Sequence, residues 1–491
     1  MPYRKDRFFA RRTALRVGMA CVAGACLLLA AGCAVGPDYR RPDTPVPSAY
    51  DALGTPAASR TSVATPGEAN LVEWWKNFND DVLTSLVRRA VQSNLDVRQA
   101  QARIRQARAQ RGVVAAGLWP EVDANASYMR SRTSGSTGGS AGGGGTTFNL
   151  FQAGLDAAWE LDFFGGTRRN VEASDADIRA SEEDRRDVLV SLVGDVGTNY
   201  AALRGLQKQI EIARKNLEAQ ERTAGITRKR YEAGYVSVLD VANADALVAS
   251  TQSQIPLLES SARGTIYTLS VLLGLEPAAL ADELAAASPI PPIPPEVPVG
   301  IPSDLLRRRP DIRRAEAQIH ASTARIGVAT ADLFPKFSLT GSMGLSSSDL
   351  SSMGNLASRT WSFGPSVTWP IFAAGRIQAN IEVQNALQEQ ALIGYQKAVL
   401  TAMKDVETAL VAYAKEQEHR KALAVTVENY RKAVDLSMTL YVTGRVDFLN
   451  VLAAQRSLFT SEDALAQSTR NLATGLVALY KALGGGWENL P

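Results

Sequence analysis

Apolar and polar residues alternate along two stretches that flank a glycine-rich segment. Between Val122 and Tyr128 every second residue is apolar and the residues between are acidic or polar, and a similar alternation runs from Phe151 to Phe163. A period of two residues is typical of a strand whose two faces meet different surroundings. The segment 134–145 is too rich in glycine and serine to pack a core. The pattern therefore predicts a β-hairpin with a flexible loop.

The same arrangement returns near residue 340. Alternating apolar positions run from Phe337 to Leu345, a serine-rich loop follows, and a second alternating stretch runs from Trp361 to Trp369. Two hairpins give four predicted strands per chain.

Long helices are predicted between and after the hairpins. From Arg376 to Tyr441 there is no proline and a single glycine, and the apolar positions step by three and four residues, as they do along a coiled-coil seam. At a rise of 1.5 Å per residue such a helix extends on the order of 100 Å. The segment 170–231 is comparable. A second helix begins after each Tyr-x-x-Gly and runs to Gly274 or Gly484, so we expect two long helical hairpins and an α+β fold.

The chain consists of two copies of one unit. The residues from Asp96 to Ile104 reappear from Asp311 to Ile319, at an offset of 215, and the block from Tyr231 to Ala244 reappears from Tyr441 to Ala454, at an offset of 210. Repeats define the organisation of a fold before any single motif does. We predict these segments: signal peptide 1–32, extended N-terminal segment 33–70, first repeat 71–288, proline-rich linker 289–302, second repeat 303–486 and tail 487–491.

The N-terminus has the features of an export signal. A basic stretch ends at Arg16, an apolar run covers 17–31, and small residues lead into Cys33. An ordinary secretory signal and a membrane anchor helix are the alternatives. The run resembles a bacterial lipobox, whose cysteine receives a diacylglyceryl group, and Cys33 is the only cysteine that the mature chain would keep. We therefore expect a lipid on Cys33, and the following Ala34 points by resemblance to the outer membrane.

Charge and chemistry exclude several function classes. Residues 1–32 carry six basic residues and one acidic one, so the net charge of +3 leaves −2 for the remainder of the 491-residue chain. This charge predicts no binding to nucleic acid, which needs clustered basic residues. The only histidines, His320 and His419, lie far apart on predicted helices, and we expect both at the surface. No metal or phosphate motif is present, so no catalytic residue, metal or cofactor is predicted.

Two environments fit strands with unlike faces. One is a soluble sandwich, and the other is a membrane barrel with its apolar face against lipid. Four strands cannot close a barrel, because unpaired edges would lie in hydrocarbon. In the barrel case several chains must share one barrel, and two or three chains both give an even number of strands.

Several motifs carry a resemblance to a known family. They are the leader Gly32-Cys33-Ala-Val-Gly-Pro37-Asp38-Tyr39, the pair Trp74-Trp75, the segment Ile301 to Ile312 and both Tyr-x-x-Gly blocks. The chain resembles the outer-membrane efflux lipoproteins, which are TolC-like channels of resistance-nodulation-division pumps. The resemblance implies a homotrimer with a shared twelve-strand barrel, a periplasmic tunnel of helices, a periplasmic adaptor and an inner-membrane transporter. It implies a passive exit duct for drugs or other small molecules.

Two further functions stay open at this point. Within the channel class, the duct could serve type I protein secretion or metal-ion export. In a different class, the chain could be a periplasmic coiled-coil scaffold tethered to the outer membrane.

The hairpin tips contain the residues singled out as functional. By resemblance, Tyr231, Gly234, Tyr441 and Gly444 form the turns and the adaptor dock. Ser237-x-x-Asp240 has the spacing of a capping box, and Asp447 is a candidate helix cap at the equivalent place. In the family, acids of the second hairpin commonly line the closed end, whereas this chain has Asn450 and Ala453 at the matching positions. That leaves Asp240 and Asp447 as the nearby carboxylates, so we expect weaker cation selectivity.

Leu449 is the candidate gate. Leu449 and Ala453 are four residues apart and share one face of the predicted helix. In a trimer Leu449 would recur as an apolar ring, and hydrophobic constrictions gate pores by resisting wetting. The alternative is that Leu449 packs within its hairpin, as its counterpart Leu239 would.

Overall fold

The computed structural model describes residues 34–54, 62–65, 67, 71–134 and 145–488. The signal peptide, Cys33 and most of the glycine-rich loop lie outside these residues. The chain forms two compact units, and each contains parts of both sequence repeats. Unit 1 consists of Met1–Pro42, Ile104–Ala180 and Ala315–Gly394, and unit 2 consists of Asp43–Arg103, Ser181–Arg314 and Tyr395–Pro491.

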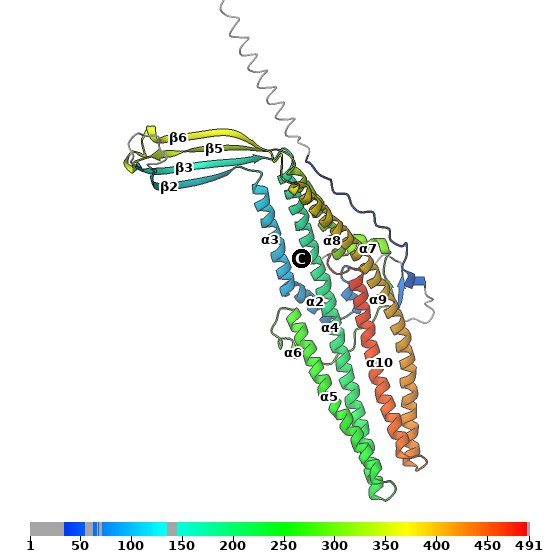
Figure 1. Cartoon of the computed structure of the whole chain (residues 1–491). Coiled ribbons are helices and arrows are strands. Elements are labelled where there is room, and N and C mark those ends of the chain that lie inside the picture. The colour runs from blue at the N-terminus through cyan, green and yellow to red at the C-terminus, as the bar shows by residue number, and fades with distance from the viewer. Residues whose placement is uncertain (1–33, 55–61, 66, 68–70, 135–144, 489–491) are drawn as a thin grey trace, which may run out of the picture. The chain divides into compact units, whose positions relative to one another are not determined.

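Unit 1 contains a four-stranded antiparallel sheet (Figure 1). Its strands, in spatial order, are β2 (Glu121–Arg132), β3 (Thr147–Leu161), β5 (Lys336–Ser347) and β6 (Arg359–Thr368). Both predicted hairpins are confirmed, although Phe163 and Trp369 lie just beyond the strand ends. Strands β3 and β5 join the two repeats, so β2 and β6 are left at the edges of the sheet.

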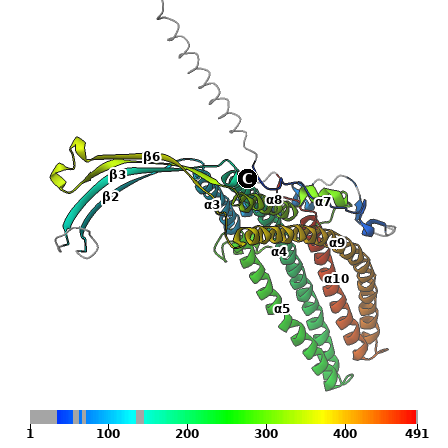
Figure 2. The same ribbon diagram turned by 45° about the horizontal axis from the view of Figure 1, so that its top comes forward.

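Helices form most of the remaining structure. They are α2 (Asp81–Ser93), α3 (Leu95–Ala116), α4 (Gly166–Glu232), α5 (Val238–Leu272), α6 (Ala281–Leu284), α7 (Pro302–Arg308), α8 (Pro310–Ala331), α9 (Arg376–Val442) and α10 (Phe448–Ala482), with short 3₁₀ turns η1 (Asp51–Gly54), η2 (Trp74–Phe78), η3 (Leu350–Ser352) and η4 (Leu356–Ser358). Within unit 2, α5 lies beside the distal part of α4, and α10 lies beside α9 (Figures 1 and 2). The two predicted helical hairpins are therefore confirmed.

Among the described residues, every helix is too short or too polar to cross a membrane.

Two short strands correct the prediction of four strands per chain. Strand β1 (Val63–Thr65) lies in the N-terminal segment, and β4 (Glu296–Pro298) lies in the linker; together they form a parallel two-stranded sheet. The prolines of 289–302 are incompatible with a central strand. Both strands of a two-stranded sheet are edges, where proline is tolerated. The side chain of Val297 is fully buried, so this strand helps to fix the linker.

The Trp74-Trp75 pair lies in the core of unit 2. The Trp74 ring stacks on that of Tyr480, with 5.1 Å between centroids. A Cβ atom on Gly197 would lie 3.0 Å from the Trp74 ring, so glycine lets α4 approach this indole closely. Nearby, Asp80 caps α2 by accepting from Leu83 N, and its other oxygen accepts from the Tyr200 hydroxyl at 2.7 Å. One aromatic stack and one shared carboxylate thus fix the start of α2.

Candidate functional site

The strand register places apolar and polar residues on opposite faces of the sheet. One face collects Val122, Ala124, Ala126 and Tyr128 of β2, Phe151, Ala153, Leu155, Ala157 and Trp159 of β3, Phe337, Leu339, Met343 and Leu345 of β5, and Trp361, Phe363, Pro365 and Val367 of β6. The other face carries hydroxyl, amide and acidic side chains, which include the hydrogen-bonded pairs Ser338–Ser366 and Ser342–Ser362. In a single chain most of both faces is solvent-exposed or only half-buried. A continuous exposed apolar face of this size indicates contact with lipid or with another chain.

Two glycines meet at the centre of the polar face. Gly154 of β3 lies opposite Gly344 of β5. A Cβ atom on Gly154 would lie 2.9 Å from the Met343 carbonyl oxygen, and one on Gly344 would lie 2.6 Å from the Ala153 carbonyl oxygen. Glycine in a strand often marks a bend or a close approach of two backbones. Glycine therefore lets the backbones of β3 and β5 approach closely on the polar side of the sheet.

The two hairpin tips share one turn geometry. Gly234 has a φ of +80° and Gly444 a φ of +72°. The amide of the residue after each glycine donates to a carbonyl five residues earlier, Tyr235 to Arg230 and Arg445 to Leu440. This is the Schellman motif, in which the residue after the helix adopts the left-handed conformation that glycine allows at least cost. The glycine of each Tyr-x-x-Gly block is therefore required by the turn.

The helices that follow the turns begin differently. Ser237 and Asp240 form the predicted capping box of α5: the Asp240 amide donates to the Ser237 hydroxyl, and the Ser237 amide donates to the Asp240 carboxylate. Asp447 occupies the N-cap position of α10, but its side chain makes no capping hydrogen bond. The Asp447 carboxylate is therefore left exposed at the tip of the second hairpin.

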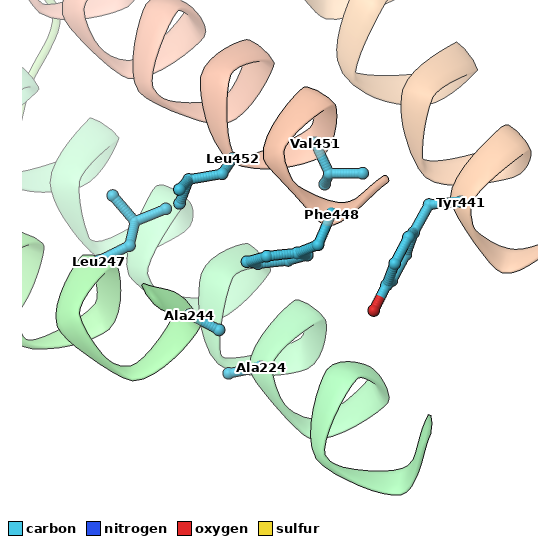
Figure 3. Packing of buried hydrophobic residues seen from close by; sticks show 7 residues of the cluster. All are labelled: Ala224, Ala244, Leu247, Tyr441, Phe448, Val451 and Leu452. Carbon is cyan, nitrogen blue, oxygen red and sulfur yellow. The ribbon is translucent and has the colours of Figure 1, made fainter. Parts of the chain in front are cut away.

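An apolar cluster joins the two tips (Figure 3). Its buried members are Ala224, Ala244, Leu247, Tyr441, Phe448, Val451 and Leu452. Tyr441 is 1% exposed and its ring lies 5.6 Å from that of Phe448, whereas the equivalent Tyr231 is 46% exposed. The second hairpin thus packs its first turn against α4 and α5, and the first hairpin has no equivalent burial of its own tyrosine.

Arg230 adds a polar link between the tips, which the sequence reading did not identify. Its Nη1 donates to the main-chain carbonyls of Tyr441 and Val442, at 2.9 Å each, and its guanidinium lies 4.7 Å above the Tyr441 ring. The last carbonyls of a helix lack intrahelical donors and carry partial negative charge. Arg230 of α4 therefore caps α9. The repeat offset puts Leu440 at the equivalent place, so the link runs in one direction only.

The remaining tip residues are exposed in the single chain. Asn450 and Ala453 lie on the outside of α10, and Leu449 is 59% exposed. Leu239 is 65% exposed. The expectation that Leu239 packs within its hairpin is wrong, because the first turn of α5 turns this side chain away from the apolar cluster. Packing within the hairpin does not account for Leu449 either, and its assignment as a gate stays a prediction.

A buried arginine holds the segment that follows Cys33. Arg169 of α4, whose side chain is 7% exposed, donates from Nε to the Val35 carbonyl and from Nη2 to Asp38, at 2.7 Å. Gly36, with a φ of +91°, lies so close to Gly327 of α8 that a Cβ atom would lie 2.4 Å from the Gly327 Cα. The segment that follows the predicted lipid site is therefore fixed to α4 and α8 within unit 1.

Glu172 supports this contact from the next turn of α4. It accepts from Arg169 at 2.8 Å and contacts His320 Nε2 at 3.0 Å, and the His320 ring stacks on Tyr39 at 4.4 Å. Burial favours a raised pKa for Glu172, but the hydrogen bonds from Arg169 and His320 outweigh it and lower the pKa. The expectation that both histidines lie at the surface is wrong for His320, which is largely covered because the N-terminal segment packs on it. His419 is exposed as expected.

The comparisons with known proteins agree on one family. A sequence profile of the outer membrane efflux protein family matches residues 86–275 and 301–485, one match in each repeat. The chain is 36% identical over 475 residues to the pyoverdine export outer membrane protein OpmQ of Pseudomonas aeruginosa, with 95% of this chain and 96% of that protein covered. It is 33% identical to nodulation protein T of Rhizobium leguminosarum bv. trifolii, over 94% of this chain and 96% of that protein.

Solved structures give the same result. The outer-membrane channel OprN has a TM-score of 0.84 at 39% identity, covering 93% of this chain and all of the solved chain. The open state of the MtrE outer membrane channel of Neisseria gonorrhoeae has a TM-score of 0.78 at 28% identity, covering 93% and 99%. These relatives favour an efflux channel over a tethered scaffold. The chain belongs to the outer membrane efflux protein family and is an outer-membrane channel of an efflux system.

Proposed function

We propose that three copies of this chain form the passive exit duct of a tripartite pump, which expels small molecules. The observation that carries the proposal is the two-faced sheet, whose edge strands β2 and β6 each have no strand on their outer side among the described residues of one chain. Unpaired backbone groups are very costly in hydrocarbon, so a membrane sheet must close on itself. Three copies would give twelve strands, with the apolar face toward lipid and the polar face around water.

The close approach of the backbones at Gly154 and Gly344 supports this direction of closure. A barrel with a water-filled interior needs its polar face on the concave side, and that is the side on which the two glycines remove side chains. The diacylglyceryl group on Cys33 would anchor each copy, and the contacts of Arg169 would keep the anchored segment beside unit 1.

The helical hairpins would extend into the periplasm and carry the aperture at their tips. The exposed Leu449 side chains of three copies would form the apolar constriction, and Arg230 with the apolar cluster would hold each second hairpin against the first. A periplasmic adaptor would dock at the turns, and a resistance-nodulation-division transporter in the inner membrane would supply energy. The duct then needs no catalytic group, because cargo only has to pass.

Two measurements test the proposal. The mass of the detergent-solubilised particle should equal three chains, and a stable monomer would contradict the shared barrel. Deletion of the gene that encodes this chain should raise the sensitivity of the cell to a panel of small toxic compounds. Loss of a secreted protein with unchanged sensitivities would favour type I secretion, and selective sensitivity to metal ions would favour metal export.

A further inference from the structure

The carboxylates of the four-stranded sheet lie on one face and its arginines lie on the other. Within the four strands, all of which the structure describes, the carboxylates on the polar face are Glu121, Asp123, Asp156 and Glu160. The apolar face of the same strands has no carboxylate but has three arginines, Arg130, Arg132 and Arg359. Arg130 and Arg132 alternate in step with Tyr128, and Arg359 lies opposite Leu345. Charges that served only solubility would be expected on the polar face, so these arginines need another explanation.

All three arginines lie at the same end of the sheet. Arg132 is the last residue of β2, and Arg359 is the first residue of β6. Helices α3, α4, α8 and α9 join the strands at the opposite end (Figure 1). In the proposed duct these helices extend toward the periplasm. The arginines would therefore lie at the outer surface of the outer membrane.

The apolar band of the sheet has the height of a lipid core. On β3, Phe151 and Leu161 are ten residues apart, which is about 34 Å of strand and, at the usual tilt of about 40°, about 26 Å of height. The lipid-facing band of outer-membrane barrels is about 25 Å tall. Phe151 pairs with Tyr128 of β2, and their ring centroids are 4.7 Å apart. This aromatic pair marks the outer edge of the band.

Arg130 and Arg132 follow directly beyond this edge on β2. The residues opposite them on β3, Asn149 and Thr147, are polar. The side chains of all three arginines are exposed, and none forms an ion pair with a residue that the structure describes. Two residues of strand cover about 7 Å, and an arginine near the end of an apolar surface extends its charged group into the polar layer. The guanidinium groups would therefore lie at the level of the lipid headgroups.

We propose that Arg130, Arg132 and Arg359 bind phosphate groups of the phosphorylated glycolipid in the outer leaflet of the outer membrane. The proposal rests on the membrane barrel proposed above and assigns a specific lipid to its outer rim. A guanidinium donates two parallel hydrogen bonds to one phosphate, and basic sites at a membrane surface bind anionic headgroups. A lipid phosphate is the anion that fits, because directly below the arginines the same face of the sheet would be covered by lipid chains.

Native mass spectrometry of the full-length, detergent-solubilised protein tests this site, with lipid A as the probe. Lipid A that carries both phosphates should bind about tenfold more tightly than the same lipid after enzymatic removal of the phosphates. Arg130→Gln, Arg132→Gln and Arg359→Gln should each weaken binding of the phosphorylated lipid about tenfold, the usual effect of losing a hydrogen bond to a charged group. None should change binding of the dephosphorylated lipid. The matched control is Lys336→Gln, which removes a positive charge from the polar face and should change neither affinity.

The outcomes separate the lipid site from the barrel. Equal binding of the two forms of lipid A to the wild-type protein would overturn the proposal, because the arginines would then only extend toward water. An equal loss of affinity in Lys336→Gln would attribute the binding to net charge and would also overturn it. Competition by inorganic phosphate at the concentration of the lipid would indicate a site for free phosphate in place of a lipid site.

The same spectra report the mass of the particle. A three-chain particle with no preference for phosphate overturns the lipid site alone, whereas a particle with the mass of one chain contradicts the shared barrel.

Discussion

Equivalent residues of the two repeats have different surroundings at the hairpin tips. Tyr441 is enclosed by Phe448 and the Arg230 guanidinium, while Tyr231 is half exposed. Phe448 is buried in the cluster, and its counterpart Val238 is exposed. Individual side chains therefore give different surroundings to two hairpins whose turns share one geometry.

Truncation of Leu449 tests the gate. Leu449→Ala should raise single-channel conductance in planar bilayers, because the smaller side chain widens and wets an apolar ring. The thermal midpoint should change little, because the side chain is 59% exposed in the chain. The matched control is Leu239→Ala, which removes an equally exposed leucine from the first hairpin and should change neither property. A destabilised trimer with unchanged conductance would show that Leu449 is a packing residue.

The contact of Glu172 with Arg169 and His320 predicts an acid-sensitive N-terminal segment. Because the folded state lowers the pKa of Glu172 below its usual value of 4.5, its stabilising contribution is complete above that value and is lost as the pH falls through the folded pKa. Glu172 faces Arg169 and His320, Asp38 shares Arg169, and Tyr39 covers His320.

Glu172→Gln should therefore lose stability mainly at neutral pH and should approach the wild-type value under acid conditions. Thermal midpoints of the two trimers, measured between about pH 6 and pH 3, check this directly. A constant difference across that range would mean that the Glu172 carboxylate is not the titrating partner.

At the scale of elements, a turn glycine and a glycine inside a helix predict opposite effects of the same substitution. Gly444→Ala should destabilise the second hairpin by about 1–2 kcal/mol, the usual cost of a left-handed backbone for a residue with a Cβ atom. Gly225→Ala, inside α4 with no atom within 4 Å of the added Cβ, should stabilise by up to about 1 kcal/mol. Thermal unfolding of both variants tests whether the φ of +72° at Gly444 causes the destabilisation. Equal effects of the two substitutions would exclude this cause.

The periodicity of apolar residues and the internal repeat predicted the long strands and helices. They did not predict the short strands or the contacts between residues that are far apart in the sequence. Alternation from Val122 to Tyr128 and from Phe337 to Leu345 identified β2 and β5, whereas the three residues of β1 or β4 are too few to display a period. Arg230 was missed because its acceptors are main-chain carbonyls 211 and 212 residues away, and no residue type marks a carbonyl. Arg169 was missed for the same reason, since the carbonyl of Val35 is one of its partners. Leu239 was misjudged because helical spacing does not say which face meets a neighbouring hairpin.

At the scale of the whole molecule, the predicted lipid on Cys33 would be an anchor in addition to the proposed barrel. Cys33→Ser should abolish incorporation of labelled fatty acid, because no other cysteine remains in the predicted mature chain. A barrel alone can hold the chain in the membrane, so the trimer should still assemble. Label in the Cys33→Ser protein would refute the lipoprotein assignment, and a wild-type protein without label would do the same.

The Arg230 link has a genetic consequence. Its acceptors on α9 are backbone carbonyls, which every amino acid supplies, so replacements at Val442 leave the hydrogen bonds available. No substitution at position 230 supplies the same planar set of donors, since lysine carries only a compact ammonium group. Consider a bacterial population exposed to large toxic compounds that enter when the aperture does not close. Codon 230 should then be under strong purifying selection, while substitutions at codon 442 should be neutral.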